Sequence, residues 1–516
     1  MMKKREKAGR TNGTVLDYLK KKYIQGFSRK QLLILDFLIC FLFFAPFLRL
    51  HFSADSYTVL AYQGIIGAGG GSHMGNGRVA AAFLAEMLRV LGINPVLDTA
   101  FGVFAMIFAS AWCMANITGW VMEGNNGSSV WLTAAVIQAG CMVGFCNVFI
   151  AEWYQFTESL LIYAAASACC VFAARCFAQN KKLAAFFILS AGYNFYQSAM
   201  AFFVFLILIF ILKKYGFRFQ IGAVKETVTG AFVCAFVFGT NFFMTKLLST
   251  YGILPYASRY NQVGMDCMAA NLKLLLEHQK LLWLKADGMM RFPLTAICMA
   301  IMVFLAVFAF LQKRRYQLLD ACYTFIMLAG GVVVVFLPVV MLQTFWLAPR
   351  SVVPLFFSFT ALAVYLAFQG KTWAKMSAFG CLCLLLVGML KNVHIYGQDI
   401  RHNNEKDEQY IHMVQEKIED YERQSQIRVE YLGFCADANV RWRWDLQGEY
   451  AWDVLPRIMT VDWARLDAFY YFEKEKYQLT EVPEEYAQYF MQNDWDAPDM
   501  DAQIRFEGNK CYIAVF

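Results

Sequence analysis

The sequence predicts an all-α polytopic membrane protein with about 11 transmembrane helices, followed by a small C-terminal extracytoplasmic α+β domain. Of the 516 residues, 59% are hydrophobic and only 16% are charged, whereas soluble proteins carry about 25% charged residues. Apolar runs of about 18 residues or more, long enough to cross a bilayer, recur up to residue 391. Residues 393–516 instead hold 25 acidic and 13 basic residues, so two differently built parts share one chain.

The first 30 residues form a basic arm, which the positive-inside rule places in the cytoplasm. Residues 31–50 are the first predicted span. Because this apolar run continues without a small-residue cleavage site, it is expected to be a retained anchor rather than a signal peptide. The polar, glycine-rich loop at 51–78 is therefore expected on the outer side of the membrane.

Residues 77–92 have a helical period but carry two arginines and a glutamate, so they are expected to lie flat on the outer leaflet. The later spans are predicted at 97–119, 130–149, 153–175, 183–196, 197–213, 226–248, 293–312, 318–341, 351–369 and 375–391. Each basic cluster between them then faces the cytoplasm, as the positive-inside rule requires. If residues 77–92 spanned the membrane, most of these clusters would face outward.

The predicted organisation is thus a cytoplasmic arm (1–30), a transmembrane domain (31–392) with an outer catalytic loop at 51–96, and an extracytoplasmic acidic domain (393–516). Two cysteines of the last region, Cys435 and Cys511, either form a bridge or remain reduced thiols. Its tryptophans either stack on sugars or, as the favoured alternative, form the core of a small domain; they are Trp442, Trp444, Trp452, Trp463 and Trp495.

Ionisable residues gather at the predicted outer ends of the spans, while the middle of the membrane is nearly free of charge. They are Asp55, Asp98, Glu152, Glu158, Lys246 and Arg350. An ion-coupled transporter needs such groups at mid-depth, whereas an enzyme acting on a lipid headgroup needs them at one interface. The pattern favours the enzyme over two alternatives, a lipid-linked sugar transporter or flippase and a non-catalytic accessory protein.

Five short segments follow one another in a recognisable order. They are FSADSYTV (52–59), GRVAAAFLAEMLRVLGINP (77–95), FIAEWYQFTESLLIYAAA (149–166), YNFYQSAMAF (193–202) and APRSVVPLFF (348–357). In this order they resemble the bacterial Gtr-type glucosyltransferases, which belong to the GT-C class of membrane glycosyltransferases and modify O-antigen and related cell-surface polysaccharides.

The resemblance implies a GT-C-like fold in the bacterial inner (plasma) membrane. It also implies transfer of a sugar, expected to be glucose, from a polyprenyl-phosphate donor to a surface glycan on the outer face. Such enzymes use an acid of the first outer loop as base, and many carry two adjacent acids there. Here Asp55 is followed by Ser56, which leaves Asp55 as the single expected base.

The chemistry assigns roles to further residues. A carboxylate within reach of the acceptor hydroxyl can take its proton, which is the role of Asp55. Arginine matches phosphate oxygens, so Arg350 and Arg78 are the first expected donor-phosphate ligands, with Lys246 and Arg259 behind them. Sugar and acceptor binding are assigned to Glu152, Trp153, Tyr154, Glu158, Tyr193, Tyr196 and Gln197. For the two glutamates, simple stabilisation by a helix dipole is the alternative.

No cofactor is expected, and no Cys/His spacing indicates a metal site. A metal is therefore not predicted, although the sequence leaves a divalent ion open. The expected partners are the lipid bilayer, the polyprenyl-phosphate sugar and the glycan acceptor, with a flippase and a donor synthase as further proteins. Nucleic acid is not among them.

Overall fold

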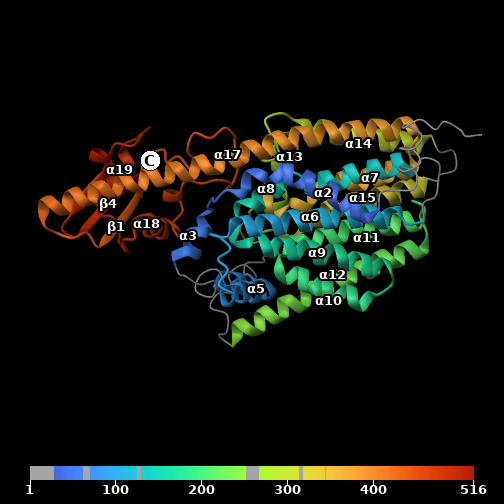
Figure 1. Cartoon of the computed structure of the whole chain (residues 1–516), viewed down its shortest axis with the longest axis horizontal. Helices are drawn as coiled ribbons and strands as arrows, with labels where there is room; N and C mark the ends of the chain where they lie inside the picture. The colour runs from blue at the N-terminus through green and yellow to red at the C-terminus, as the bar shows by residue number, and fades with distance from the viewer. Residues whose placement is uncertain (1–27, 62–69, 125–129, 252–265, 313–317, 343–344) are drawn as a thin grey trace, which may run out of the picture.

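A helix bundle and a small sheet domain lie at opposite ends of an elongated molecule, joined by one very long helix (Figure 1). The computed structural model describes residues 28–61, 70–124, 130–251, 266–312, 318–342 and 345–516. The first half of the bundle contains α2 (Arg29–Phe44), α3 (Ala54–Ala61), α4 (Gly70–Gly75), α5 (Val79–Val90), α6 (Thr99–Met122), α7 (Val130–Phe145), α8 (Val148–Gln155), α9 (Leu160–Ala178) and α10 (Lys182–Phe195). The second half contains α11 (Met200–Lys214), α12 (Ile221–Thr250), α13 (Met268–Lys285), α14 (Leu294–Leu311), α15 (Leu318–Met341) and α16 (Phe357–Gln369).

Nine helical segments of the described residues are long and apolar enough to cross a membrane, which marks the chain as a multi-pass membrane protein. Each predicted span coincides with a helix. However, α10 and the apolar segment Val353–Gln369, which correspond to the predicted spans 183–196 and 351–369, are shorter than these nine. The predicted count of eleven is therefore not confirmed.

The segment predicted to lie flat on the membrane is the helix α5. Its 12 residues extend over about 18 Å, too short to cross a hydrocarbon core of about 30 Å. Its apolar stripe is exposed, with Phe83 74% accessible. The helix is found at the same end of the bundle as α3 (Figure 1), and its contact with lipid stays a prediction.

Small residues allow α7 and α16 to approach closely. A Cβ atom added to Gly140 would lie 2.6 Å from the Ala363 Cβ, and one added to Gly144 would lie 2.7 Å from the Phe357 ring. Such small-residue contacts drive helix packing in lipid, where there is no hydrophobic gain from contact between helices. Beyond α7, Asn147 caps α8 by accepting hydrogen bonds from the N–H groups of Phe149 and Ile150, each at 3.0 Å. The chain therefore breaks and restarts as a short helix at the end of the bundle.

The helix α17 (Thr372–Ser425) is 54 residues long and runs from the bundle into the C-terminal domain (Figure 1). Its first part is apolar, and its second part packs into the core of the domain through Tyr410, Ile411, Val414 and Ile418. The boundary placed at 392/393 from composition thus falls inside a continuous helix.

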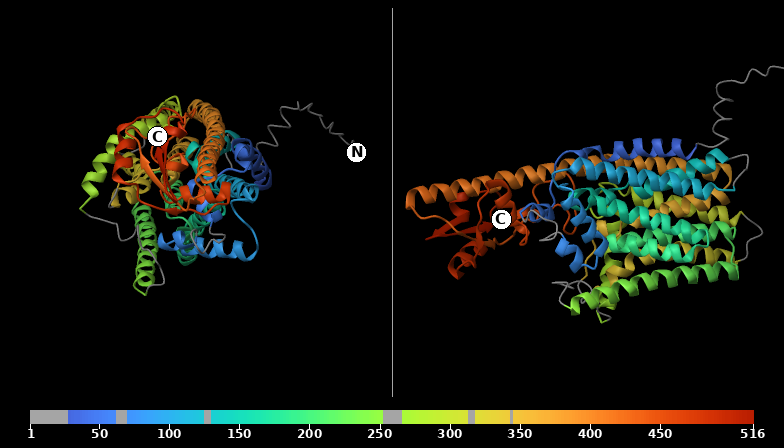
Figure 2. Two further views of the ribbon diagram at one scale, coloured as in Figure 1. Left: turned by 90° about the vertical axis from the view of Figure 1, so that its left-hand side faces the viewer. Right: turned by 60° about the horizontal axis from the view of Figure 1, so that its bottom comes forward.

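The C-terminal domain has the expected α+β character. Its sheet has the order β2-β1-β4-β3, with β1 parallel to β2 and β4 and with β3 antiparallel to β4. The strands are β1 (Tyr431–Ala436), β2 (Gln478–Leu479), β3 (Ile504–Glu507) and β4 (Lys510–Val515), and the helices are α18 (Arg465–Glu473), α19 (Glu484–Gln492) and α20 (Met500–Gln503). Cys435 and Cys511 are unbridged thiols. Figure 2 shows from two further directions that this domain lies beyond the end of the bundle that carries α3 and α5.

Candidate active site

Asp55 lies in the first turn of α3, directly beyond the first span, and its side chain is exposed. Ser53 and Ser56 hold this helix start through reciprocal hydrogen bonds: the Ser53 Oγ accepts from the Ser56 N–H at 3.1 Å, and the Ser53 N–H donates to the Ser56 Oγ at 3.0 Å. A side chain that satisfies the unpaired N–H groups fixes the start of a helix, and the helix N-terminus favours an anion. The fold therefore presents the Asp55 carboxylate to solvent from a defined position.

A second carboxylate reaches the same place from another part of the chain. The Ser56 hydroxyl donates to Glu158 Oε2 at 2.8 Å, and Ser53 Oγ lies 3.4 Å from Glu158 Oε1. Glu158 is close enough to Asp55 for the two charges to interact. Position 56 is therefore not an acid but a donor that holds Glu158 near Asp55. Asp55 as the single base stays a prediction, with Glu158 as a second acid in its surroundings.

Arg350 is held by acids on both sides. Its guanidinium donates to Glu152 Oε1 at 2.5 Å and, through both terminal nitrogens, to the Asp453 carboxylate, with the shorter contact at 2.5 Å. Its backbone N–H also donates to Glu152, which is completely buried. Burial by itself disfavours the charged form, but the two carboxylates raise the pKa of Arg350 well above its usual value. The residue expected to bind phosphate thus already carries two carboxylates.

Arg78 immediately precedes α5 and is positioned by the turn at 196–197. Its Nε donates to Gln197 Oε1 at 2.9 Å, and its guanidinium carbon lies 4.7 Å from the centre of the Tyr196 ring. Gln197 in turn donates to the carbonyl of Asn76 at 2.7 Å. Among the described residues, no carboxylate pairs with Arg78, so its guanidinium is oriented by neutral groups.

The aromatic residues predicted to bind sugar form a packed floor. Trp153 is fully buried and donates from its indole to the Arg350 carbonyl at 2.9 Å, and the Tyr196 hydroxyl donates to the same carbonyl at 3.3 Å. Tyr163 lies between them, with its ring centre 4.8 Å from those of Trp153 and Tyr196. It is also close enough to Arg78 and Glu158 to interact with them electrostatically. The sequence analysis missed Tyr163, although it lies five positions after Glu158 in one of the matching segments.

Other predicted residues lie away from this floor. Tyr154 is fully buried, and its ring stacks on Phe44 at 4.2 Å, so it offers no open face. Tyr193 is buried beside Phe238. Lys246 is exposed near the end of α12, and Arg259 lies outside the described residues.

Two histidines near the site, His51 and His73, are buried. The His51 ring nitrogens lie 2.8 Å from the carbonyl oxygens of Arg49 and Tyr154, which ties the start of the outer loop to α8. Burial, and then the charge of Arg78, lower the pKa of His73 to about 3. His73 is therefore neutral at physiological pH, and Arg78 remains the cation of this turn.

The C-terminal domain contributes two side chains that the loop and span patterns did not assign to the site. Asp453 forms the ion pair with Arg350, and the Trp463 indole N–H donates to Asp55 Oδ1 at 3.2 Å. The helix α18 also packs on α3, where Tyr57 lies beside Tyr471 and Phe472. The C-terminal domain thus contacts the end of the bundle that carries α3.

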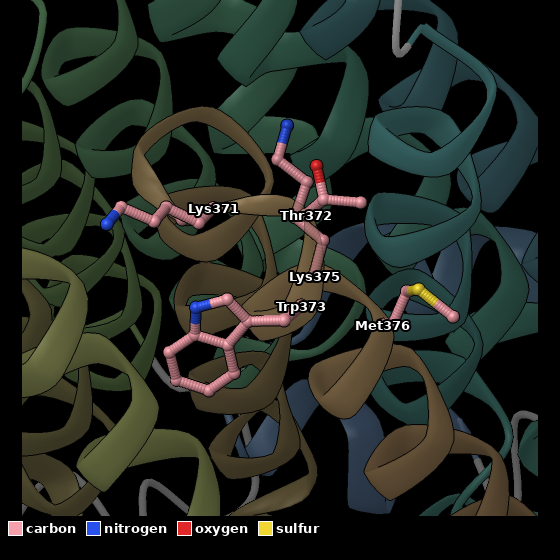
Figure 3. A pocket seen from close by; sticks show the side chains of 6 residues that line it. Lys371, Thr372, Trp373, Lys375 and Met376 are labelled. Atoms are coloured by element: carbon pink, nitrogen blue, oxygen red, sulfur yellow. The ribbon is translucent and has the colours of Figure 1, made fainter.

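A separate hollow of about 660 Å³ lies at the start of α17, at the opposite end of the bundle (Figures 1 and 3). Figure 3 shows that the side chains of Lys371 and Lys375 extend in different directions, and Lys375 donates to Thr133 Oγ1 at 3.0 Å. None of the described residues that line this hollow is a carboxylate. The acid–arginine cluster around Asp55, Glu158, Arg78 and Arg350 is therefore the better candidate site.

No group of three or more His, Cys, Asp or Glu side chains in the described part of the chain could hold a metal ion. Whether transfer requires a metal stays a prediction from the sequence.

Residues 61–369 match the model of the family described as Glucosyl transferase GtrII. Searches of the curated proteins and of the solved structures return no match. The matched segment covers more than half of the chain and contains Arg78, Glu152, Glu158 and Arg350, so this membrane protein belongs to the GtrII glucosyl transferase family.

Proposed function

We propose that this glycosyltransferase moves a sugar, glucose in the first instance, from a polyprenyl-phosphate donor to a cell-surface glycan at the outer face of the bacterial plasma membrane. The observation that carries the proposal is the convergence of an exposed carboxylate, a second carboxylate and two arginines at one end of the bundle. A base and phosphate-binding cations in one place are what transfer from a lipid phosphate requires.

In the proposed step, an acceptor hydroxyl attacks the anomeric carbon of the donor sugar while Asp55 takes its proton. The new glycosidic C–O bond forms, the bond between that carbon and the phosphate oxygen breaks, and polyprenyl phosphate leaves with the bonding electrons. The exposure of Asp55 supports this role because a substrate hydroxyl can reach it. Glu158, held by Ser56, is proposed to orient a hydroxyl of the reacting sugars.

The leaving phosphate is proposed to bind Arg78 first. Gln197 and Tyr196 fix the orientation of this guanidinium without neutralising it. Arg350 is the second ligand, reached by the phosphate when the partly exposed Asp453 carboxylate gives way. Lys246 and Arg259 remain supporting cations of the outer surface, and no cofactor is assigned.

The competing proposal is a lipid-linked sugar transporter or flippase. Its best support is Asp36 of α2, which is buried in the bundle and accepts a hydrogen bond from Gln138 of α7. A single buried acid that is paired through one oxygen with a neighbouring amide does not by itself form a polar route across the bilayer. The cluster at the end of the bundle therefore favours transfer over transport.

The test uses the purified full chain in nanodiscs with undecaprenyl-phosphate [14C]glucose and p-nitrophenyl pyranosides as acceptors. Nanodiscs have no enclosed compartment, so transport alone yields no product in them. Labelled disaccharide formed together with undecaprenyl phosphate supports the proposal. Labelled donor that crosses the bilayer of sealed vesicles without any product in nanodiscs contradicts it and favours the transporter.

A further inference from the structure

Trp463 is an exposed tryptophan held directly against Asp55. Its side chain is 66% accessible, while its indole N–H donates to Asp55 Oδ1 at 3.2 Å. The backbone on both sides is anchored, because Val461 and Ala464 are buried in the core of the C-terminal domain. The exposed ring is therefore not a loose surface residue but has a fixed place beside the carboxylate.

The N–H of this indole has a hydrogen-bond partner, whereas the two flat faces of its ring have no stacking partner among the described residues. No aromatic ring or cation stacks on Trp463 within the described residues. The contrast with other tryptophans of the same domain is clear: Trp444 donates to Asp407 and packs near Phe516, and Trp452 donates to His278 and packs on Phe345. An indole with an apolar face in water and a bound N–H is suited to a ligand that also has one apolar face.

A pyranose ring is such a ligand. Its axial C–H bonds form an apolar face that packs on the negative face of an aromatic ring, while its hydroxyls point outward to hydrogen-bonding groups. At Trp463, one such hydroxyl would lie near the Asp55 carboxylate. Because the indole N–H takes Oδ1, Oδ2 is the oxygen placed to receive the proton.

The position of Trp463 also differs from the expected position of the lipid donor. The lipid donor must stay in the membrane, and Arg78 lies beside α5 at the end of the bundle. Trp463 of the C-terminal domain contacts Asp55 two residues before α18 begins, and α18 packs on α3 at the side of α3 away from the spans (Figure 1). A surface glycan that extends away from the membrane is therefore expected to approach Asp55 from that side.

We propose that Trp463 is the stacking platform for the acceptor sugar, so that the C-terminal domain supplies the acceptor subsite of the transferase. The inference rests on the proposed function of Asp55 and assigns to the domain a role beyond it. Trp463 binds the glycan and positions the attacking hydroxyl over the base.

The test compares Trp463→Ala with Trp463→Phe in the full chain. Trp442→Ala is the matched control, because Trp442 is 59% accessible on the same domain and is not among the residues that contact Asp55. With undecaprenyl-phosphate glucose and p-nitrophenyl pyranosides, Trp463→Ala is expected to raise the acceptor KM at least tenfold, as for truncation of a binding tryptophan, without changing the donor KM. Trp463→Phe keeps a stacking face and should recover most of the loss. Trp442→Ala should match the wild type.

An acceptor KM for Trp463→Ala within twofold of wild type, or a donor KM that rises in parallel, would overturn the inference. Saturation-transfer NMR of p-nitrophenyl glucoside with the nanodisc protein provides a readout that does not need turnover. If the wild type transfers no sugar but Trp463→Ala abolishes the NMR signal, the proposed function fails and the binding platform stands. If transfer is intact and the NMR signal is unchanged in Trp463→Ala, the platform fails and the function stands.

Discussion

The guanidinium of Arg350 bridges the buried carboxylate of Glu152 and the half-exposed carboxylate of Asp453, which joins the end of the membrane bundle to the C-terminal domain. The two carboxylates differ in their access to water: the Glu152 side chain is 0% accessible and that of Asp453 is 43% accessible. This difference predicts unequal consequences when the bridge is cut.

Arg350→Ala leaves the Glu152 carboxylate buried without its cation, and loss of one partner of a buried ion pair costs about 3–5 kcal/mol. Asp453→Ala leaves Arg350 paired with Glu152, and water can replace the exposed partner, so the expected cost is about 1 kcal/mol. Thermal unfolding in detergent should therefore show a much larger drop for Arg350→Ala. The control is Asp496→Ala, which removes an exposed partner of Arg441 and should have almost no effect. Equal losses for the Arg350 and Asp453 variants would contradict the bridge.

Gly288→Ala tests a second contact between the bundle side and the C-terminal domain. Gly288 has φ +83, and a Cβ there would lie 1.8 Å from the carbonyl oxygen of Glu449. The alanine is expected to push the Glu449 backbone away from residue 288. It should also destabilise the fold by about 1 kcal/mol, because its side chain strains the left-handed backbone. The segment around Glu449 should then become sensitive to protease.

Gly508→Ala is the matched control for that substitution. Gly508 also has a left-handed φ, +57, but a Cβ there would meet no atom within 4 Å. Gly508→Ala therefore introduces the backbone strain but no collision with another atom. If both variants show the same protease pattern, the close contact at Glu449 is not what holds the domain in place.

The sequence predicted the helices well because each span is a long apolar run with charges or turn residues at its ends. It also predicted the α+β character of the tail. It could not predict that α17 continues from the last span into the domain. The composition changes from apolar to charged near residue 393, which favours a boundary there, but helix-forming residues continue across that change. Whether α10 crosses the bilayer is likewise not decided by hydropathy, since the helix has only 14 residues.

For the site, the sequence could assign candidate roles to Asp55, Glu158, Arg78 and Arg350, but not show which groups each of them contacts. The Ser56–Glu158 hydrogen bond and the Arg350–Asp453 ion pair join residues 102 and 103 positions apart, and no local pattern encodes such distances. Tyr154 was assigned to sugar binding with the other polar and aromatic residues at the predicted outer side, but at the end of α8 its ring packs on Phe44 in the core. Neighbours in a helix face different sides, and only the packing decides which side holds the site.

Glu158→Gln should lower the kcat of transfer at least tenfold, because an amide has one acceptor oxygen instead of two and cannot both hold Ser56 and orient a sugar hydroxyl, which is the role proposed for Glu158. Ser56→Ala should lower kcat less, since it removes one hydrogen bond and leaves the carboxylate. Initial rates at saturating donor, with matched protein levels, provide the comparison. Glu86→Gln, which removes an exposed partner of Arg89 on α5, serves as the control. A Glu158→Gln enzyme at wild-type rate would remove Glu158 from the mechanism.

Arg78→Ala should raise the KM for undecaprenyl-phosphate glucose at least tenfold, because a hydrogen bond to a charged group contributes about 1.5–3 kcal/mol. Arg78→Lys keeps the charge but loses the planar guanidinium, so its donor KM should lie between those of the wild type and Arg78→Ala. Arg89→Ala removes an arginine near the other end of α5, the helix that Arg78 precedes, and should leave the donor KM unchanged. An effect of Arg78→Ala on the acceptor KM alone would argue against phosphate binding.

The most direct measurement is the transfer rate of Asp55→Asn in nanodiscs with undecaprenyl-phosphate [14C]glucose. The substitution keeps the side-chain shape and an oxygen that can accept from the Trp463 indole, so it removes the base and little else. We expect kcat to fall at least about a hundredfold, with unchanged thermal stability and donor KM. Transfer at the wild-type rate by a folded Asp55→Asn protein would contradict the assignment of Asp55 as the base.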